Sequence, residues 1–265
     1  MYIDFHTHGK LAKKLPFSTE YTDWLFGEAK QAGLDALCLT EHFNTLQFDE
    51  MYQYVMESCD KDGDTLITKE GLRIFTGMET DIAEGGHVLC VGIPEEIREL
   101  NRRLEPYKEK DTFLPLEKLL DLFSEYSVKI GAGHPYREGG HIPEQPMEQL
   151  KRFHFLDLNG KDIALNCEES KEKVYALGKR LNIPVVSGSD THQAVQYGCI
   201  RTCMEQEVNT IKALYEEMLA DRYQICISDY SAFQVKTAGL LKKALKEVHA
   251  VGGDYVSVLL EQSAV

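Results

Sequence analysis

Short apolar runs alternate with amphipathic stretches along most of this chain. The runs are rich in Val, Ile, Leu and Phe, and their lengths are typical of buried strands. The runs that we expect to form strands are Tyr2 to Phe5, Ala36 to Leu39, Arg73 to Gly77, His87 to Val91, Val128 to Ala132, Ile163 to Leu165 and Pro184 to Ser187. Because strand, helix, strand repetition is typical of parallel sheets, the pattern predicts an α/β protein whose parallel sheet closes into a barrel.

Helical periodicity fills several of the gaps between these runs. The predicted helices run from Ser18 or Thr19 to Gly33, from Leu116 to Tyr126 and from Glu169 to Leu181. A chain of 265 residues can bury one sizeable core. We therefore expect residues 1–265 to form a single barrel domain, in which residues 205–265 are a mainly helical segment that covers the barrel.

Composition narrows the possible partners. The net charge of -14 opposes binding to a polyanion, so nucleic acid is not expected as a partner. No apolar stretch approaches the roughly 20 residues that a membrane span needs, and Met1 leads directly into a strand-like run without a signal-peptide pattern. The seven cysteines include no CxxC pair and indicate reduced thiols. These features predict a cytoplasmic protein that does not bind membranes.

Histidines and carboxylates gather at the ends of the predicted strands. These residues are His6, His8, Glu41, His42, Glu79, His87, His134, Asp190 and His192. Imidazole nitrogens and carboxylate oxygens are the usual ligands of zinc, manganese and iron. His6 and His8 are two positions apart, so their side chains point to the same side of a strand. Since functional groups of α/β barrels lie at the C-terminal ends of the strands, we expect a metal centre there.

Several of these segments resemble motifs of the PHP (polymerase and histidinol phosphatase) domain family of metal-dependent phosphoesterases. The matching segments are DFHTH at 4–8, LTEHF at 39–43, GMETDI and GGHVLCVG within 77–92, GHPYR at 133–137 and VSGSDTH at 186–192. The resemblance spans roughly residues 1–205. It implies a single distorted (β/α)7 TIM-like barrel whose mouth holds two or three divalent ions of zinc, manganese or iron.

The resemblance also implies how the ligands are shared among the ions. The expected sets are His6, His8, Glu79 and Asp190 for one ion, His42, His87 and His192 for another, and Glu79 with His134 for the third. Glu41 stands where the family usually has Asp, and we expect it to orient His42 from behind. Asp4 is expected to orient another ligand in the same way.

One position departs from the family pattern. About five residues after the second histidine, members of the family commonly have an Asp or His that helps to hold the third ion. In this chain the position is Lys13, followed by Lys14. A protonated lysine has no lone pair to offer a cation. Either the third ion is weakly held, or an ammonium group replaces its charge and binds the substrate directly.

The resemblance implies hydrolysis of a small-molecule phosphomonoester, histidinol-phosphate-like or nucleotide-like, by a metal-activated hydroxide. The substrate would be a small phosphorylated metabolite. Candidate phosphate-binding residues are Arg137, which can form two bonds to a phosphate, and Lys10, Lys13 and Lys14. The candidate catalytic residues are Arg137, Asp190 and His192. The general acid stays open between His192 and a metal-bound water.

Two other functions are compatible with the same residues. Amidohydrolase-type enzymes that cleave C–N bonds also begin with an HxH motif, although this chain shows no evident bridging lysine on a middle strand, and its late Asp occurs in a DxH motif. A non-catalytic, metal-binding regulatory module is the other alternative, because of Lys13. The identities of the substrate and the metal and the oligomeric state do not follow from the sequence.

Overall fold

The computed structural model of the protein describes residues 1–260. The α-helices are α1 (Thr19–Gln31), α2 (Phe48–Ser58), α3 (Pro94–Arg103), α4 (Leu116–Ser124), α5 (Met147–Leu150), α6 (Gly160–Leu181), α7 (Ile211–Leu219), α8 (Ser231–Ala250) and α9 (Tyr255–Leu260). The strands are β1 (Tyr2–Thr7), β2 (Ala36–Leu39), β3 (Asp60–Asp62), β4 (Thr65–Ile67), β5 (Arg73–Asp81), β6 (His87–Val91), β7 (Lys129–Gly133), β8 (Phe155–Asn159), β9 (Val185–Gly188), β10 (Ile200–Met204) and β11 (Tyr223–Ile227). Short 3-10 helices are η1 (Glu105–Tyr107), η2 (Lys110–Thr112), η3 (Ile142–Glu144) and η4 (Ala194–Gln196).

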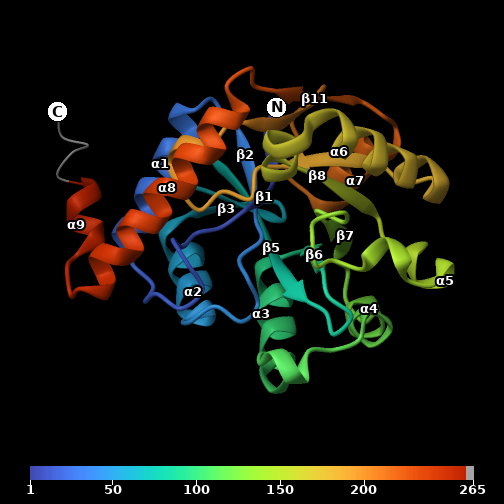
Figure 1. Cartoon of the computed structure of the whole chain (residues 1–265), viewed down its shortest axis with the longest axis horizontal. Coiled ribbons are helices and arrows are strands. Elements are labelled where there is room, and N and C mark those ends of the chain that lie inside the picture. Colours follow the sequence, from blue (N-terminus) through green and yellow to red (C-terminus); the bar gives the residue numbers. More distant parts are fainter. Residues whose placement is uncertain (261–265) are drawn as a thin grey trace.

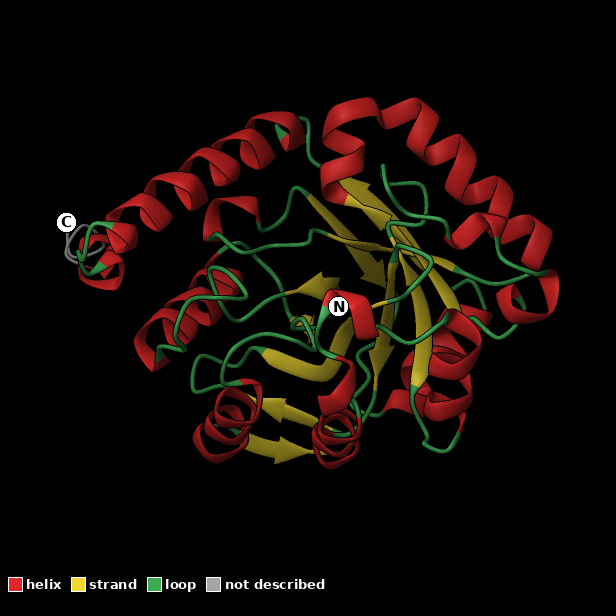
Figure 2. Cartoon of the chain, turned by 60° about the horizontal axis from the view of Figure 1, so that its bottom comes forward, coloured by secondary structure: helices red, strands yellow, loops and turns green. Residues whose placement is uncertain are grey.

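The strands form a nearly closed, barrel-shaped sheet with helices on its outside (Figure 1, Figure 2). The order of neighbouring strands is β11-β10-β1-β2-β5-β6-β7-β8-β9. The chain after β9 returns to β1, where the amide of Asp190 donates to the carbonyl of His6 at 2.7 Å and that of His8 donates to Thr191 at 3.0 Å. These bonds bring the segment that carries Asp190 beside the segment that carries His6 and His8.

The sheet is mixed: β2 is parallel to β1 and β5, and β8 is parallel to β7 and β9, but the prediction of a wholly parallel sheet was wrong. Strand β6 is antiparallel to both β5 and β7, and β10 is antiparallel to β1. The loop between β5 and β6, residues 82–86, is too short for the crossover that a parallel pair needs, and it forms a hairpin instead. The expected seven strand–helix units are not confirmed, since the sheet of the described residues has 11 strands.

Most of the predicted elements lie where the apolar pattern indicated. Helix α1 begins after Ser18, whose side chain accepts a hydrogen bond from the amide of Tyr21, as an N-cap does. The strand predicted at Ile163 to Leu165 was wrong, because these residues belong to α6. The true strand there is β8, and Asn159 at its end caps the following helix.

The segment 205–265 contains α7, β11, α8 and α9, and residues 261–265 lie outside the described part of the chain. The sequence pattern did not predict β11, which pairs antiparallel with β10. Within residues 1–260, no helix has both the length and the apolar content that crossing a bilayer requires.

Two apolar clusters cover the strands on both sides. Ile3, Phe5 and Phe75 belong to a cluster that includes side chains of α7. On β2, Leu37 and Leu39 belong to a larger cluster that side chains of the surrounding helices complete, whereas Ala36 and Cys38 belong to the first cluster. Alternate residues of one strand therefore pack in different clusters, as the two-residue period of a strand requires. Polar side chains at the strand ends lie next to this apolar core, where buried polar groups need hydrogen-bond partners.

Candidate metal centre

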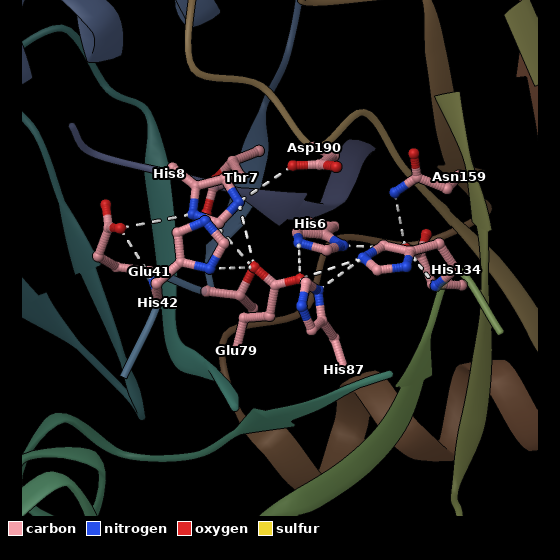
Figure 3. A network of polar contacts seen from close by, with 12 residues as sticks. His6, Thr7, His8, Glu41, His42, Glu79, His87, His134, Asn159 and Asp190 are labelled. Carbon is pink, nitrogen blue, oxygen red and sulfur yellow. Dashed lines mark hydrogen bonds and ion pairs between the residues drawn. The ribbon is translucent and has the colours of Figure 1, made fainter. Parts of the chain in front are cut away.

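The carboxylate of Glu79, on β5, lies at the middle of a cluster of imidazole rings (Figure 3). Its Oε1 atom is 2.5 Å from His87 Nδ1, 3.1 Å from His134 Nε2 and 3.4 Å from His6 Nε2. Its Oε2 atom is 2.6 Å from His42 Nδ1 and 3.6 Å from His8 Nε2. Five histidines from four separate segments of the chain thus meet around one carboxylate, as the positions at the strand ends indicated.

Asp190 and His192 close the other side of the cluster. Asp190 Oδ1 is 3.2 Å from His8 Nε2 and 3.9 Å from His192 Nε2. The ring of His8 stacks on that of His192 at a centroid distance of 4.0 Å and on that of His42 at 4.3 Å. Asp190 and His134 have positive φ angles of 59° and 31°. Such angles are uncommon outside glycine and are often found at functional sites.

Within residues 1–260, three sets of side chains place possible ligand atoms within 4.8 Å of one another. These sets are His8 with His42 and His192, His6 with His8 and Asp190, and His6 with Glu79 and His134. The cluster therefore offers overlapping sites for more than one ion.

The position of His87 differs from the grouping that the resemblance implied. It lies beside Glu79 and His134, with its Nδ1 atom 3.0 Å from His134 Nε2, and not in the set of His42 and His192. The antiparallel pairing of β6 explains this difference, because it puts His87 opposite both Asp81 and Gly133, the residue before His134.

Several rings have one nitrogen bound to a protein acceptor. His6 Nδ1 is 2.9 Å from Asp157 Oδ2, and His87 Nε2 is 3.0 Å from Asp81 Oδ1. His192 Nδ1 is 2.8 Å from the carbonyl oxygen of Lys10. Each of these bonds fixes the ring and leaves the opposite nitrogen turned toward the cluster, an arrangement that metal-binding histidines almost always have. Of these nitrogens, His6 Nε2 forms no hydrogen bond among the described residues, whereas His87 Nδ1 lies against Glu79.

Unsatisfied polar atoms at the middle of the cluster fit a cation. Among the residues described, His6 Nε2, His42 Nδ1 and Glu79 Oε2 are buried and form no hydrogen bond, although His42 Nδ1 and Glu79 Oε2 lie 2.6 Å apart. Burying such atoms without a partner costs roughly 1–3 kcal/mol each. These nitrogens and oxygens are ligands that zinc, manganese and iron accept. The side chains present therefore fit bound divalent ions.

The charges of the cluster lead to the same interpretation. Burial opposes a charge on His87, but Glu79 and Asp81 outweigh it and raise the pKa of His87 to about 9. Burial opposes a charge on His6 as well. Glu79 and Asp157 outweigh this effect and raise the pKa of His6 well above its usual range. The acidic groups thus attract positive charge to this place. A divalent ion would supply that charge and release the imidazole protons.

Asp4 and Glu41 lie behind the cluster, in positions that differ in part from those expected. Glu41 Oε1 is 3.6 Å from His8 Nδ1 and accepts a hydrogen bond from the backbone amide of His42, so Glu41 lies beside the ring of His8. Asp4 accepts hydrogen bonds from the amides of His6 and Ser189. It connects the two segments that carry His6 and Asp190 through hydrogen bonds to their backbone.

The structure places the four predicted phosphate-binding cations differently. Lys10 is buried, and its ammonium group donates to the carbonyl of Leu46, so this predicted phosphate-binding group already has an acceptor within the protein. Lys13 binds Asp81 at 3.0 Å at the edge of the cluster, whereas Lys14 is exposed.

Arg137 is the predicted cation that reaches the cluster directly. Its guanidinium group donates to Asp190 at 2.8 Å, to Asn159 at 2.6 Å and to Asp162 at 3.0 Å. Most of its donors therefore already have acceptors within the protein.

Sequence reasoning missed three residues that contact the cluster: Asp157 behind His6, Asp81 behind His87, and Lys161, whose Nζ atom is 2.8 Å from Asp190 Oδ2. Asp157 and Lys161 were missed because the strand in this region was placed at 163–165. The alternation in FLDLN, residues 155–159, was the available signal for both, since it marks a strand that ends just before Lys161.

Comparisons with known proteins reveal the fold. No protein-family model and no curated protein sequence matches the chain. Among solved structures, PsfC from Pseudomonas syringae is 22% identical with a TM-score of 0.74, over 92% of this chain and 98% of that protein. The lesion-specific endonuclease PfuEndoQ from Pyrococcus furiosus is 15% identical with a TM-score of 0.59, over 84% of this chain and 57% of that protein. An amidohydrolase from Chromobacterium violaceum is 13% identical with a TM-score of 0.51, over 84% of this chain and 97% of that protein. At these identities the likeness is one of fold.

Proposed function

We propose that this chain is a metal-dependent phosphoesterase that hydrolyses a small phosphomonoester, histidinol-phosphate-like or nucleotide-like. The observation that carries the proposal is the convergence of imidazoles on the carboxylate of Glu79, where several buried ligand atoms form no hydrogen bond. The resemblance of the motifs to the PHP family supports phosphoester hydrolysis as the reaction. The net charge of -14 supports a small phosphorylated metabolite over nucleic acid as the substrate.

The residues that would hold two or three ions of zinc, manganese or iron are His6, His8, His42, Glu79, His87, His134, Asp190 and His192. Such ions, when bound, activate water as a nucleophile near neutral pH and neutralise phosphoryl oxygens.

The protein's own groups prepare this site. Burial would raise the pKa of Asp190, but the nearby charges of Lys161, His6 and Arg137 and a hydrogen bond from His8 hold that pKa well below its usual range. Asp190 therefore stays ionised and oriented. Burial, together with the charge of His8, lowers the pKa of His192 well below its usual range. A neutral His192 whose Nδ1 proton is held by the Lys10 carbonyl favours a ligand role for its Nε2 atom over that of general acid.

Metal analysis combined with turnover of 4-nitrophenyl phosphate tests the proposal. We expect at least two ions per chain and hydrolysis that a chelator abolishes and manganese or zinc restores. Full metal occupancy without hydrolysis of any phosphoester in a broad panel would instead favour the regulatory module. Cleavage of C–N substrates with no phosphatase activity would favour the amidohydrolase alternative.

The Lys13→Asp variant is expected to bind one more ion than the wild type and to change its metal dependence. Lys13 binds Asp81, and Asp81 in turn binds His87. Replacing the ammonium group by a carboxylate would put two acidic groups beside this histidine, and together they attract a cation. The measurement is the metal-to-protein ratio by mass spectrometry after equilibration with manganese. Lys13→Met, which removes only the positive charge, is the control, and an unchanged ratio in Lys13→Asp would contradict the prediction.

A further inference from the structure

A hollow of about 440 Å³ opens beside the candidate metal centre, on the side of Asn159 and His134 (Figure 3). Residues 136–138, which follow His134, line one wall, and α6, which follows Asn159, lines the other. The side-chain amide of Asn159 and the backbone amide of His134 both donate to Asp157 Oδ2, at 2.9 Å and 3.4 Å. The two walls therefore begin at the carboxylate that orients His6.

The wall that α6 contributes is one face of the helix. Lys161, Leu165, Glu169 and Lys173 follow one another at intervals of four residues, and all of them line the hollow. Residues four apart lie on the same face of a helix. On the opposite wall, the centroid of the Tyr136 ring lies 6.0 Å from Lys173 Nζ. The hollow is therefore a groove between this face of α6 and the segment that carries Tyr136.

The inner end of the hollow reaches the candidate metal ligands. Arg137 and Lys161 line it there, and each of them binds Asp190 Oδ2 at 2.8 Å. The side chains of Arg137 and Lys161 are 27% and 34% exposed. Those of Glu169 and Lys173, farther along α6, are 51% and 49% exposed. A molecule in the hollow would thus have one end next to Asp190 and the other end near solvent.

Large apolar side chains are exposed in this hollow. Leu165 is 80% exposed and Tyr136 is 39% exposed, and both line it. Leu158 and Val174, which are buried, also contribute to the lining. Exposed apolar side chains that share a hollow with polar neighbours are typical of ligand-binding grooves. A flat apolar group bound there would remove Leu165 and the ring of Tyr136 from water, which is favourable.

The charges of the lining favour an uncharged occupant over a second anion. Among the described residues that line the hollow, each lysine and arginine side chain already binds a carboxylate of the protein. The carboxylate of Glu138, in contrast, has neither a hydrogen bond nor an ion pair within residues 1–260. A further negative charge would meet this carboxylate without a free cation to offset it, and like charges placed together are unfavourable.

We infer that this hollow binds the leaving group of the substrate, and that Leu165 and Tyr136 select a leaving group with a flat, uncharged ring. The inference rests on the proposed function, which supplies the phosphomonoester and puts its phosphoryl group at the metal ligands. The contacts of Arg137 and Lys161 with Asp190 join the hollow to those ligands. The substrate class is then a phosphomonoester of an alcohol that carries such a ring, and Leu165 determines specificity without touching the reacting atoms.

The test compares Leu165→Ala with Leu240→Ala, the same change at a position of α8 that is 71% exposed. Calorimetry measures the affinity of the full chain, loaded with manganese, for methylphosphonate and for benzylphosphonate, which resist hydrolysis. Because the hollow would bury the ring, we expect the wild type to bind benzylphosphonate roughly 10-fold to 100-fold more tightly. In Leu165→Ala this preference should fall roughly 3-fold to 10-fold, with unchanged affinity for methylphosphonate. Leu240→Ala should keep the full preference.

The metal content of Leu165→Ala and its thermal unfolding should stay at wild-type values, because this side chain is exposed and offers no ligand atom. An unchanged preference for benzylphosphonate in a folded, metal-loaded Leu165→Ala protein would overturn the inference, even if the wild type proves to be a phosphatase. Conversely, a preference that depends on Leu165 in a protein that hydrolyses no phosphoester would contradict the proposed function and leave the ring-binding hollow in place.

Discussion

Replacing Glu79 by glutamine is expected to abolish phosphoester hydrolysis and to remove most of the bound metal. Burial alone would raise the pKa of this carboxyl group, but the charges of His87, His42 and His6 hold it well below its usual range, so it is ionised. An amide is neutral and offers a cation one oxygen instead of two. Since bound ions contribute several kcal/mol of transition-state stabilisation, we expect the rate to fall on the order of 10³-fold or more.

The matched control for this variant is Glu70→Gln, the same chemical change at an exposed position just before β5. It should keep the wild-type rate and metal content. Both are measured on the same preparations, with 4-nitrophenyl phosphate for turnover and mass spectrometry for metal. If Glu79→Gln retained wild-type metal content and turnover, the carboxylate at the middle of the cluster would not be a ligand, and the proposed centre would fail.

The candidate ligands could be predicted from the sequence because their chemistry is visible in single residues. An HxH pair at the end of an apolar run implies two rings on one side of a strand, and His6 and His8 do lie in one cluster. No sequence motif identifies the groups that orient these rings. Asp157 looks like any carboxylate within an apolar run, and only the pairing of β8 with its neighbours places it behind His6.

Which rings share an ion also depends on strand direction, which apolar runs do not encode. A run of five apolar residues fits a parallel strand as well as an antiparallel one. The hairpin between β5 and β6 decides the direction here, and it puts His87 beside His134. The resemblance to a family therefore named the candidate residues, but their grouping in space depends on the pairing of the strands.

The cations show the limit of motif reasoning most clearly. Lysines next to the HxH motif were the natural candidates for phosphate binding, but Lys10 and Lys13 have partners within the protein. Lys161, which binds Asp190, was not a candidate, because the strand in this region was predicted at 163–165.

Replacing Gly188 by alanine is expected to destabilise the protein and to weaken its metal binding. Gly188 ends β9, where it lies against the part of β1 that carries His6. An added Cβ atom would overlap the Cβ atom of His6 and would approach the His6 amide nitrogen to 2.8 Å and Asp157 Oδ1 to 2.9 Å. Two of these obstacles belong to the main chain or to its first side-chain atom, so a rotamer change cannot relieve the clash, and β1 and β9 must move apart.

Overpacking of this kind costs typically about 1–3 kcal/mol, which for a chain of this size lowers Tm by roughly 2–12 °C. Because the displaced residues are His6 and the carboxylate that orients it, the metal-to-protein ratio should fall as well. Gly27→Ala is the matched control: a Cβ atom there would meet nothing within 4 Å, and alanine in the interior of α1 should raise stability by about 0.5–1 kcal/mol. The measurements are the Tm of both variants, from thermal unfolding followed by circular dichroism, and their metal-to-protein ratios. Equal stability of the two variants would mean that β9 does not hold His6 in the way the structure indicates.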